Sequence, residues 1–226
     1  MNNKNSNCAE CPFKIDDKLC KNINGHFLPS CPTKEKDSLT QTSLKKYDKT
    51  NIHEFAKQSA IQEGEGYTPT KCNNKVKPSK SRIEEIVDFA KKMNYKKLGL
   101  CFCIGLMNEA KVVDKILKDN GFTVVSVICK TGRIPKENIS IEEYQKVHPN
   151  KFEPMCNPIM QADILNEAKT DFNIMMGLCV GHDSLFLKHS TAMTTVFAVK
   201  DRLLGHNPLA AIYTNKSYYS FLNDSI

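Results

Sequence analysis

The sequence of 226 residues contains no tryptophan and only three arginines, Arg82, Arg133 and Arg202, although its lysines bring the formal net charge to +7. Surfaces that recognise nucleic acids combine positive charge with arginine forks and stacked rings. Because this chain has few arginines and no tryptophan to combine with its lysines, the positive charge indicates a solvated surface. We therefore expect no nucleic-acid partner.

The sequence also lacks an apolar run of the roughly 20 residues needed to cross a bilayer. Its first seven residues, MNNKNSN, have no apolar segment of the kind found in a secretory signal. We therefore expect a cytoplasmic protein without a membrane partner. In that compartment, ten cysteines favour metal ligation or redox chemistry over a disulfide framework.

Composition divides the chain into three regions. Residues 1–33 carry a cysteine cluster among prolines and glycine that prevent a long helix. Residues 34–80 are polar and lysine-rich, with a weak helical stripe from Ile52 to Ala60 and a loop or linker over 68–80. From residue 81 the apolar pattern becomes regular. We thus predict a four-cysteine metal-binding module (1–33), a polar helix and linker (34–80) and a larger domain (81–226).

Apolar strands alternate with amphipathic helices in the region 81–226. A capping box, Ser81 with Glu84, predicts a helix to about Tyr95, and Asn157 with Pro158 predicts the start of another. Buried strands are predicted over 98–104, 122–129, 172–179 and 194–199, with a possible fifth over 209–213. Such alternation is typical of an α/β domain with a largely parallel sheet and flanking helices.

The amino-terminal cysteines follow the spacing C-x2-C-x8-C-x10-C: Cys8, Cys11, Cys20 and Cys31. Their surroundings hold too few apolar side chains to fold by burial alone, whereas four thiolates on one cation would cross-link them. Tetrahedral zinc suits such a closed set. An iron–sulfur cluster stays an alternative, although the dense C-x2-C-x2-C run of bacterial ferredoxins is missing.

A second set of cysteines occupies the predicted strand ends. Cys103, Cys129 and Cys179 end the first three strands, and Cys156 precedes a helix N-cap. The carboxyl ends of parallel strands share one edge, where α/β proteins place their sites. We predict that these four thiols form a site for an iron–sulfur cluster or zinc. The alternative is that they are buried core residues, as we expect for Cys101; Cys72 is expected to belong to neither site.

Two polar residues accompany this second set. His182 and Asp183 follow Cys179 in a segment with two glycines, so we predict that they handle protons at the site. His182 could also be a ligand or an outer partner, and a histidine hydrogen-bonded in a turn explains it equally well. The residues 200–202 and 206–208 are weaker candidates for the same rim, because a solvated loop accounts for them.

The chain closely resembles a bacterial and archaeal family catalogued as domain of unknown function 1847. The matching segments are residues 82–86, 98–106, 127–130, 155–159, 177–186, 199–202 and 206–208. The amino-terminal cysteine pattern is also similar, so that the resemblance covers nearly the whole chain except 34–80. It implies a cysteine-rich, metal-binding protein, commonly of anaerobes, and it implies no reaction.

Three functional hypotheses follow. The first is a metalloprotein whose second thiolate site acts in redox or sulfur chemistry, with a small molecule or a redox protein as partner. The second is a non-enzymatic metal carrier, sensor or interaction module with two structural metal sites. The third is a thiol enzyme with Cys156 or Cys179 as nucleophile. Spacing alone leaves the metals, the substrate and the oligomeric state open.

Overall fold

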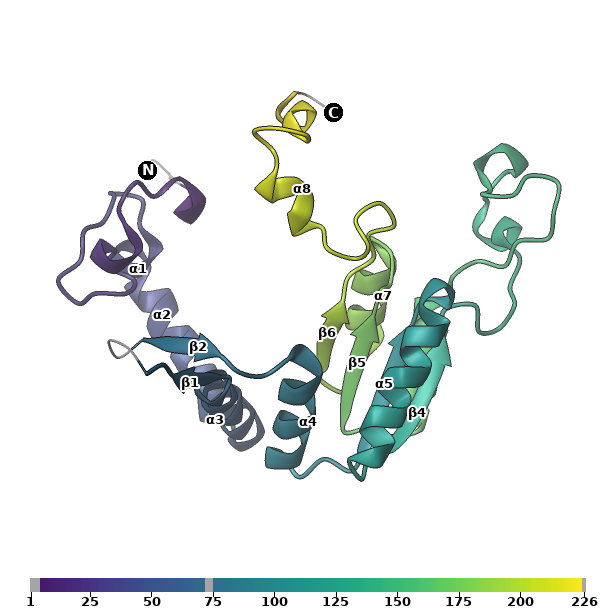
Figure 1. The fold of residues 1–226 in the computed structure, drawn as a ribbon, viewed down its shortest axis with the longest axis horizontal. Helices are drawn as coiled ribbons and strands as arrows, with labels where there is room; N and C mark the ends of the chain where they lie inside the picture. Colours follow the sequence, from purple (N-terminus) through teal and green to yellow (C-terminus); the bar gives the residue numbers. More distant parts are fainter. Residues whose placement is uncertain (1–4, 72–74, 225–226) are drawn as a thin grey trace. The chain divides into compact units, whose positions relative to one another are not determined.

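The structure is a computed structural model, and it describes residues 5–71 and 75–224 (Figure 1). Cys72 lies outside the described residues. The chain divides into two compact units, one up to Ile61 and one from Gln62 onward. The thiols of interest are therefore held by two separately packed parts of the chain.

The amino-terminal unit contains short helical turns and no buried side chain among residues 5–61. Its elements are η1 (Cys8–Glu10), η2 (Ile15–Asp17), α1 (Pro32–Glu35), α2 (Asp37–Leu44), η3 (Lys45–Asp48) and most of α3 (Thr50–Glu65). The predicted helix around 52–60 is confirmed as part of α3, whereas α1 and α2 were not predicted. Without a buried core, this unit needs another source of stability.

The second unit begins with a small hairpin where the sequence predicts a loop. Strands β1 (Tyr67–Pro69) and β2 (Val76–Pro78) pair antiparallel, with Thr68 opposite Lys77. The prediction of a loop over 68–80 is therefore wrong for these residues. Tyrosine, threonine and valine favour strands, and the prolines that disguise them stand at strand ends, where proline is tolerated.

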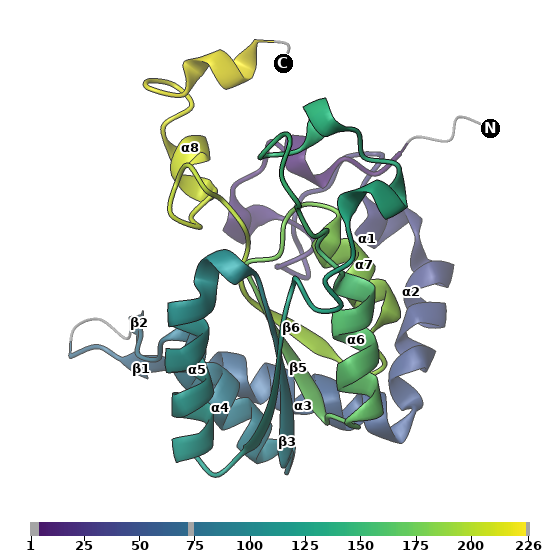
Figure 2. The same cartoon turned by 90° about the vertical axis from the view of Figure 1, so that its right-hand side faces the viewer.

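A four-stranded parallel sheet forms the centre of the second unit, as predicted. Its strands are β3 (Lys97–Phe102), β4 (Thr123–Ile128), β5 (Phe172–Met176) and β6 (Thr194–Ala198), in the order β4-β3-β5-β6. Helices α4 (Arg82–Lys92) and α5 (Met107–Asp119) cover one face, and α6 (Pro158–Glu167) and α7 (His182–His189) cover the other (Figure 2). The α/β class is thus confirmed.

The predicted helix starts are confirmed by their hydrogen bonds. The Glu84 carboxylate accepts from the Ser81 backbone N–H at 2.7 Å, and the Asn157 side chain accepts from the Met160 N–H at 3.1 Å. The remaining elements are η4 (Ile104–Leu106), η5 (Lys136–Ile139), η6 (Glu143–Gln145), α8 (Leu209–Tyr213) and η7 (Ser220–Asn223).

Two strand predictions need correction. The segment 209–213 is the helix α8, because it has no neighbouring strand to pair with and its Leu-Ala-Ala core favours a helix. The strands that precede Cys103, Cys129 and Cys179 also end earlier than predicted, at Phe102, Ile128 and Met176, so the three cysteines follow their strands rather than end them. Over residues 5–71 and 75–224, we find no helix with the length and hydropathy needed to span a bilayer.

Gly99 in β3 leaves room for the buried side chain of Asn173 in β5. A Cβ at Gly99 would lie 2.0 Å from Asn173 Oδ1, which accepts a hydrogen bond from Thr170 at 2.7 Å. We predict that Gly99→Ala lowers the free energy of unfolding by about 1–3 kcal/mol, as overpacking does. Urea unfolding followed by circular dichroism measures this.

The matched control is Gly64→Ala in α3, where a Cβ would meet no atom within 4 Å. Because alanine favours helices over glycine, this change should leave stability equal or raise it by up to about 1 kcal/mol. If both variants lost the same free energy of unfolding, the contact with Asn173 would not be what excludes a larger side chain at Gly99.

Candidate functional site

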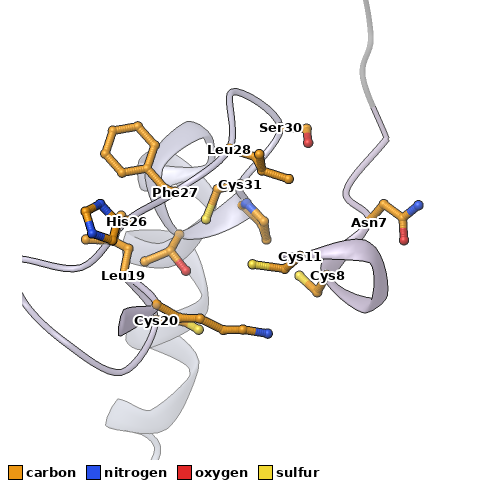
Figure 3. Close-up of a pocket in the computed structure, with 13 residues that line it drawn as sticks. Asn7, Cys8, Cys11, Leu19, Cys20, His26, Phe27, Leu28, Ser30 and Cys31 are labelled. Carbon is orange, nitrogen blue, oxygen red and sulfur yellow. The ribbon is translucent and has the colours of Figure 1, made fainter. Parts of the chain in front are cut away.

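The four amino-terminal cysteines line one cavity of about 70 Å³. Figure 3 shows the side chains of Cys8, Cys11, Cys20 and Cys31 around this space, with His26 nearby. Cys11 and Cys31 are half-buried, whereas Cys8 and Cys20 are exposed. The structure therefore brings the predicted set to the walls of a single cavity, near the surface of its unit.

Short backbone turns carry these cysteines. The Cys11 N–H donates to the Cys8 carbonyl at 3.3 Å and closes the C-x2-C turn. A loop that ends with the Leu19 N–H donating to the His26 carbonyl at 3.0 Å places Cys20. This loop requires Gly25, because a Cβ there would lie 2.4 Å from the backbone of Lys18.

As they stand, these side chains are not arranged as a metal site. Among residues 5–71 and 75–224, no three His, Cys, Asp or Glu side chains are placed so that they could hold a metal ion. Lining a shared cavity is a weaker arrangement than ligation, so a bound metal requires the sulfurs to move closer together.

The second set of cysteines meets at the carboxyl edge of the sheet. Cys103 directly follows β3 and Cys129 directly follows β4, the neighbouring strand. Cys156 reaches them because the Asn157 N–H donates to the Cys129 carbonyl at 2.8 Å. The thiol of Cys129 is the hydrogen-bonding neighbour of both other thiols. We call Cys103, Cys129 and Cys156 the thiol trio.

Backbone amides point at two sulfurs of the trio. The Ile104 N–H donates to Cys129 Sγ at 3.3 Å, and the Gly105 N–H interacts with Cys103. Cys129 is only 1% exposed and Cys103 7%, whereas Cys156 is half-buried. Amide hydrogen bonds favour sulfur with negative charge. The Gly105 bond therefore helps to lower the pKa of Cys103, and the Ile104 bond opposes the other contacts of Cys129, which raise its pKa.

Three cysteines near this edge of the sheet, Cys103, Cys156 and Cys179, each have a cationic neighbour. Lys200 interacts with Cys103 and Lys130 with Cys156, while Arg202 Nη2 donates to Cys179 Sγ at 3.0 Å. No ion pair found within residues 5–71 and 75–224 involves any of these three cations. Their charges are therefore available to sulfur.

These contacts divide the trio into two thiolates and one thiol. The hydrogen bond from Cys129 lowers the pKa of Cys103 to about 5, with help from Gly105 and Lys200 against desolvation. A second interaction of Cys129, with Cys156, acts together with Lys130 and His182 to lower the pKa of Cys156 to about 5. The pKa of Cys129 is raised in turn, because its proton serves both neighbours. Perturbed pKa values of this kind often mark functional sites.

Of the predicted residues Cys179, His182 and Asp183, the last two begin α7 and Cys179 precedes it. Among the described residues, Cys179 pairs with Arg202 rather than with the other thiols. The charge of His182 acts on Cys156. Asp183 Oδ1 accepts a hydrogen bond from the Ser184 N–H at 2.7 Å. The structure thus assembles three of the four predicted thiols, with His182 near one of them.

Sequence reasoning missed two contributors to the site. Lys130 follows Cys129 in a lysine-rich chain, so nothing distinguishes it before the fold is known. Gln161 is fully buried on α6, and its Nε2 donates to the carbonyls of Phe102 at 3.2 Å and Val127 at 2.8 Å. Its Oε1 has no hydrogen-bond partner among the described residues. The usable signal was a polar residue in the buried stripe of a helix.

The low pKa of Cys156 has a testable consequence. In metal-free protein, the rate of Cys156 alkylation by iodoacetamide should change little between about pH 6 and pH 8, because the thiolate already predominates. In Cys129→Ala, the pKa of Cys156 should rise, and the rate should then fall by roughly tenfold for each pH unit below the new pKa. Mass spectrometry of the Cys156 peptide measures the rates.

The control for this experiment is Lys130→Met, which removes a smaller cause of the shift and should change the pH profile less than Cys129→Ala does. A wild-type rate that climbs steeply between about pH 6 and pH 8 would contradict the assigned ionisation.

Comparison with known proteins places the chain in a family. A family model described as "Protein of unknown function (DUF1847)" matches residues 31–197. The match includes 34–80, contrary to expectation, and it leaves out Cys8, Cys11 and Cys20 as well as Lys200 and Arg202. The chain is also 47% identical to the uncharacterized protein MJ0455 of Methanocaldococcus jannaschii over 184 residues, which cover 81% of this chain and 87% of the relative. The chain therefore belongs to the DUF1847 family of proteins of unknown function.

Proposed function

We propose that this chain is a cytoplasmic, cysteine-rich metal-binding protein whose amino-terminal cysteines hold a metal and whose thiol trio acts in redox or sulfur chemistry. One observation carries the proposal. Cys8, Cys11, Cys20 and Cys31 line a single cavity in a unit whose described residues include no buried side chain. Metal ligation would supply the stability that burial does not.

The donor set favours zinc at the amino-terminal site. Four thiolates around one Zn²⁺ form a closed structural site, and the C-x2-C turn is a usual part of it. Four thiolates and one divalent cation leave two negative charges, and Lys18 on the cavity wall can offset part of them. An iron–sulfur cluster takes the same ligands and is the alternative occupant.

The thiol trio offers ligands for a cofactor, although its three sulfurs, as they stand, are also not placed to hold a metal ion. Cys103, Cys129 and Cys156 would supply three thiolate ligands to zinc or to an iron–sulfur cluster, with Cys179 held elsewhere by Arg202. The amides of Ile104 and Gly105 would hydrogen-bond to the ligand sulfurs, as is usual around iron–sulfur clusters. Such a group would supply Lewis acidity or electron storage, while His182 and Asp183 would handle protons.

Exposure of two cysteines favours a second candidate function. Cys8 and Cys20 lie at the surface, where an incoming ligand can reach a bound metal. This suits a non-enzymatic metal carrier, sensor or interaction module, in which the amino-terminal site exchanges its metal or responds to it. The two functions differ in whether loss of the thiol trio abolishes a reaction.

Metal analysis tests the proposal. We expect anaerobically purified protein to contain about one equivalent of zinc, or iron with sulfide, at the amino-terminal site. Cys11→Ser and Cys31→Ser should each lose most of this metal, because a structural site tolerates the loss of a ligand poorly. Elemental and sulfide analysis, with visible absorbance spectra, provides the measurement.

Cys101→Ala is the matched control. Cys101 is fully buried in β3, and burial raises the pKa of its thiol, so it is unsuited to ligation. This variant should be less stable and retain its metal. Wild-type protein without metal, or equal metal content in the Cys11→Ser and wild-type proteins, would refute the amino-terminal site. Loss of a separate equivalent in Cys156→Ser would locate metal at the trio.

A further inference from the structure

We propose that Cys156 and Cys129 form a redox-active dithiol pair that reduces disulfide substrates, with Cys156 as the attacking thiol and Cys129 as the resolving thiol. The proposal deepens the redox chemistry proposed above for the trio and is independent of metal at the amino terminus. It assigns a reaction, a substrate class and an order of events to these cysteines.

The two side chains are adjacent and differently accessible. Cys129 belongs to the apolar core cluster and Cys156 packs against it, while the Asn157 N–H holds the Cys129 carbonyl at 2.8 Å. Cys129 is 1% exposed, so a bulky disulfide cannot reach its sulfur. Cys156 is half-buried and can meet a substrate. Because of this difference in exposure, the substrate disulfide reacts first with Cys156, and the buried Cys129 then resolves the mixed disulfide.

Cys156 also lies close to polar groups that suit an attacking sulfur. The side chains of Lys130 and His182 both interact with its sulfur. Cys156 also directly precedes Asn157, the N-cap of the ten-residue helix α6, whose positive end stabilises a nearby anion. Asp183 is the acidic residue nearest to His182 along the chain. Its carboxylate accepts a hydrogen bond from the Ser184 N–H.

The reaction balances without an added cofactor. The Cys156 thiolate attacks one sulfur of a substrate disulfide, RS–SR, forming a Cys156–SR mixed disulfide and releasing RS⁻. Cys129 then loses its proton to RS⁻ and attacks Cys156 Sγ, which releases the second RS⁻ and forms the Cys129–Cys156 disulfide. The substrate gains two electrons and the protein pair is oxidised by two. A small thiol or a dithiol protein restores the pair.

Cys103 fills a different position in the trio. It is 7% exposed and fixed between β3 and η4, with Lys200 at its sulfur. Cys156 instead ends the connection of 28 residues, 129–156, between β4 and the N-cap of α6. Cys156 is also more exposed than Cys103, so a substrate reaches Cys156 first. We therefore assign Cys103 as a neighbour that polarises Cys129.

The experiment uses full-length, anaerobically purified protein and 2-hydroxyethyl disulfide as the probe. After reaction, digestion without reductant and mass mapping locate every disulfide. We expect a Cys129–Cys156 bond in wild-type protein and in the Cys101→Ala control. Cys129→Ser should instead accumulate the mixed disulfide on Cys156, because nothing resolves it. Cys156→Ser should leave Cys129 unmodified. A purely structural role for the trio would not produce this reciprocal pattern.

Three outcomes would overturn the inference. These are a Cys103–Cys129 bond with Cys156 free, a Cys129→Ser protein that carries no adduct at Cys156, and wild-type protein whose trio does not react because it retains bound metal. Metal content, measured on the same samples, separates this failure from that of the proposed function. A metal-free protein that forms the Cys129–Cys156 bond would refute the amino-terminal metal site and support the dithiol.

Discussion

The parallel pairing of β3 with β4 is the constraint on which the candidate site depends. Phe102 lies opposite Ile128 in the register, so the next residues, Cys103 and Cys129, leave the sheet side by side. Gln161 reinforces this edge from α6 by donating to one carbonyl of each strand. A shift of the register by one residue would exchange the faces of all side chains in a strand. The apolar strands and the buried glutamine therefore determine whether the thiols meet.

Charge explains why the thiols can remain together. Thiolates in a partly buried cluster repel each other and lose hydration, and this cluster lies at the edge of the apolar core. The proton of Cys129, two backbone amides and the cations Lys130 and Lys200 compensate for this cost. A divalent metal would compensate for it in another way. Metal binding, as proposed above, would therefore act on the same residues that the cations now stabilise.

The sequence predicted the α/β class, the central strands and the helix starts, because apolar runs, capping residues and the Asn-Pro pair each have a local physical meaning. It also placed Cys103 and Cys129 near the ends of two strands, although each cysteine follows its strand and the pairing of these strands was not predicted. It could not separate Cys179 from the trio, because that depends on where the turn after β5 directs a side chain. The roles of Lys130 and Gln161 were equally hidden, since each arises only when segments distant in sequence come together. The error over 209–213 has the same origin: an apolar run becomes a strand only where a partner strand is available.

The two cysteine sets differ in what their surroundings already provide. Residues 5–61 include no buried side chain, so the amino-terminal cysteines have no folded core that would hold their sulfurs apart or together. If these cysteines bind a metal as proposed, ligation and folding would be one event for them. The trio stands at the edge of a sheet whose core residues Leu98, Leu100 and Ile174 are fully buried, so its geometry exists before any ligand binds. Preorganised groups lose less on reaction than groups that must first be ordered. This difference is why we propose a structural role for the amino-terminal set and chemistry at the trio.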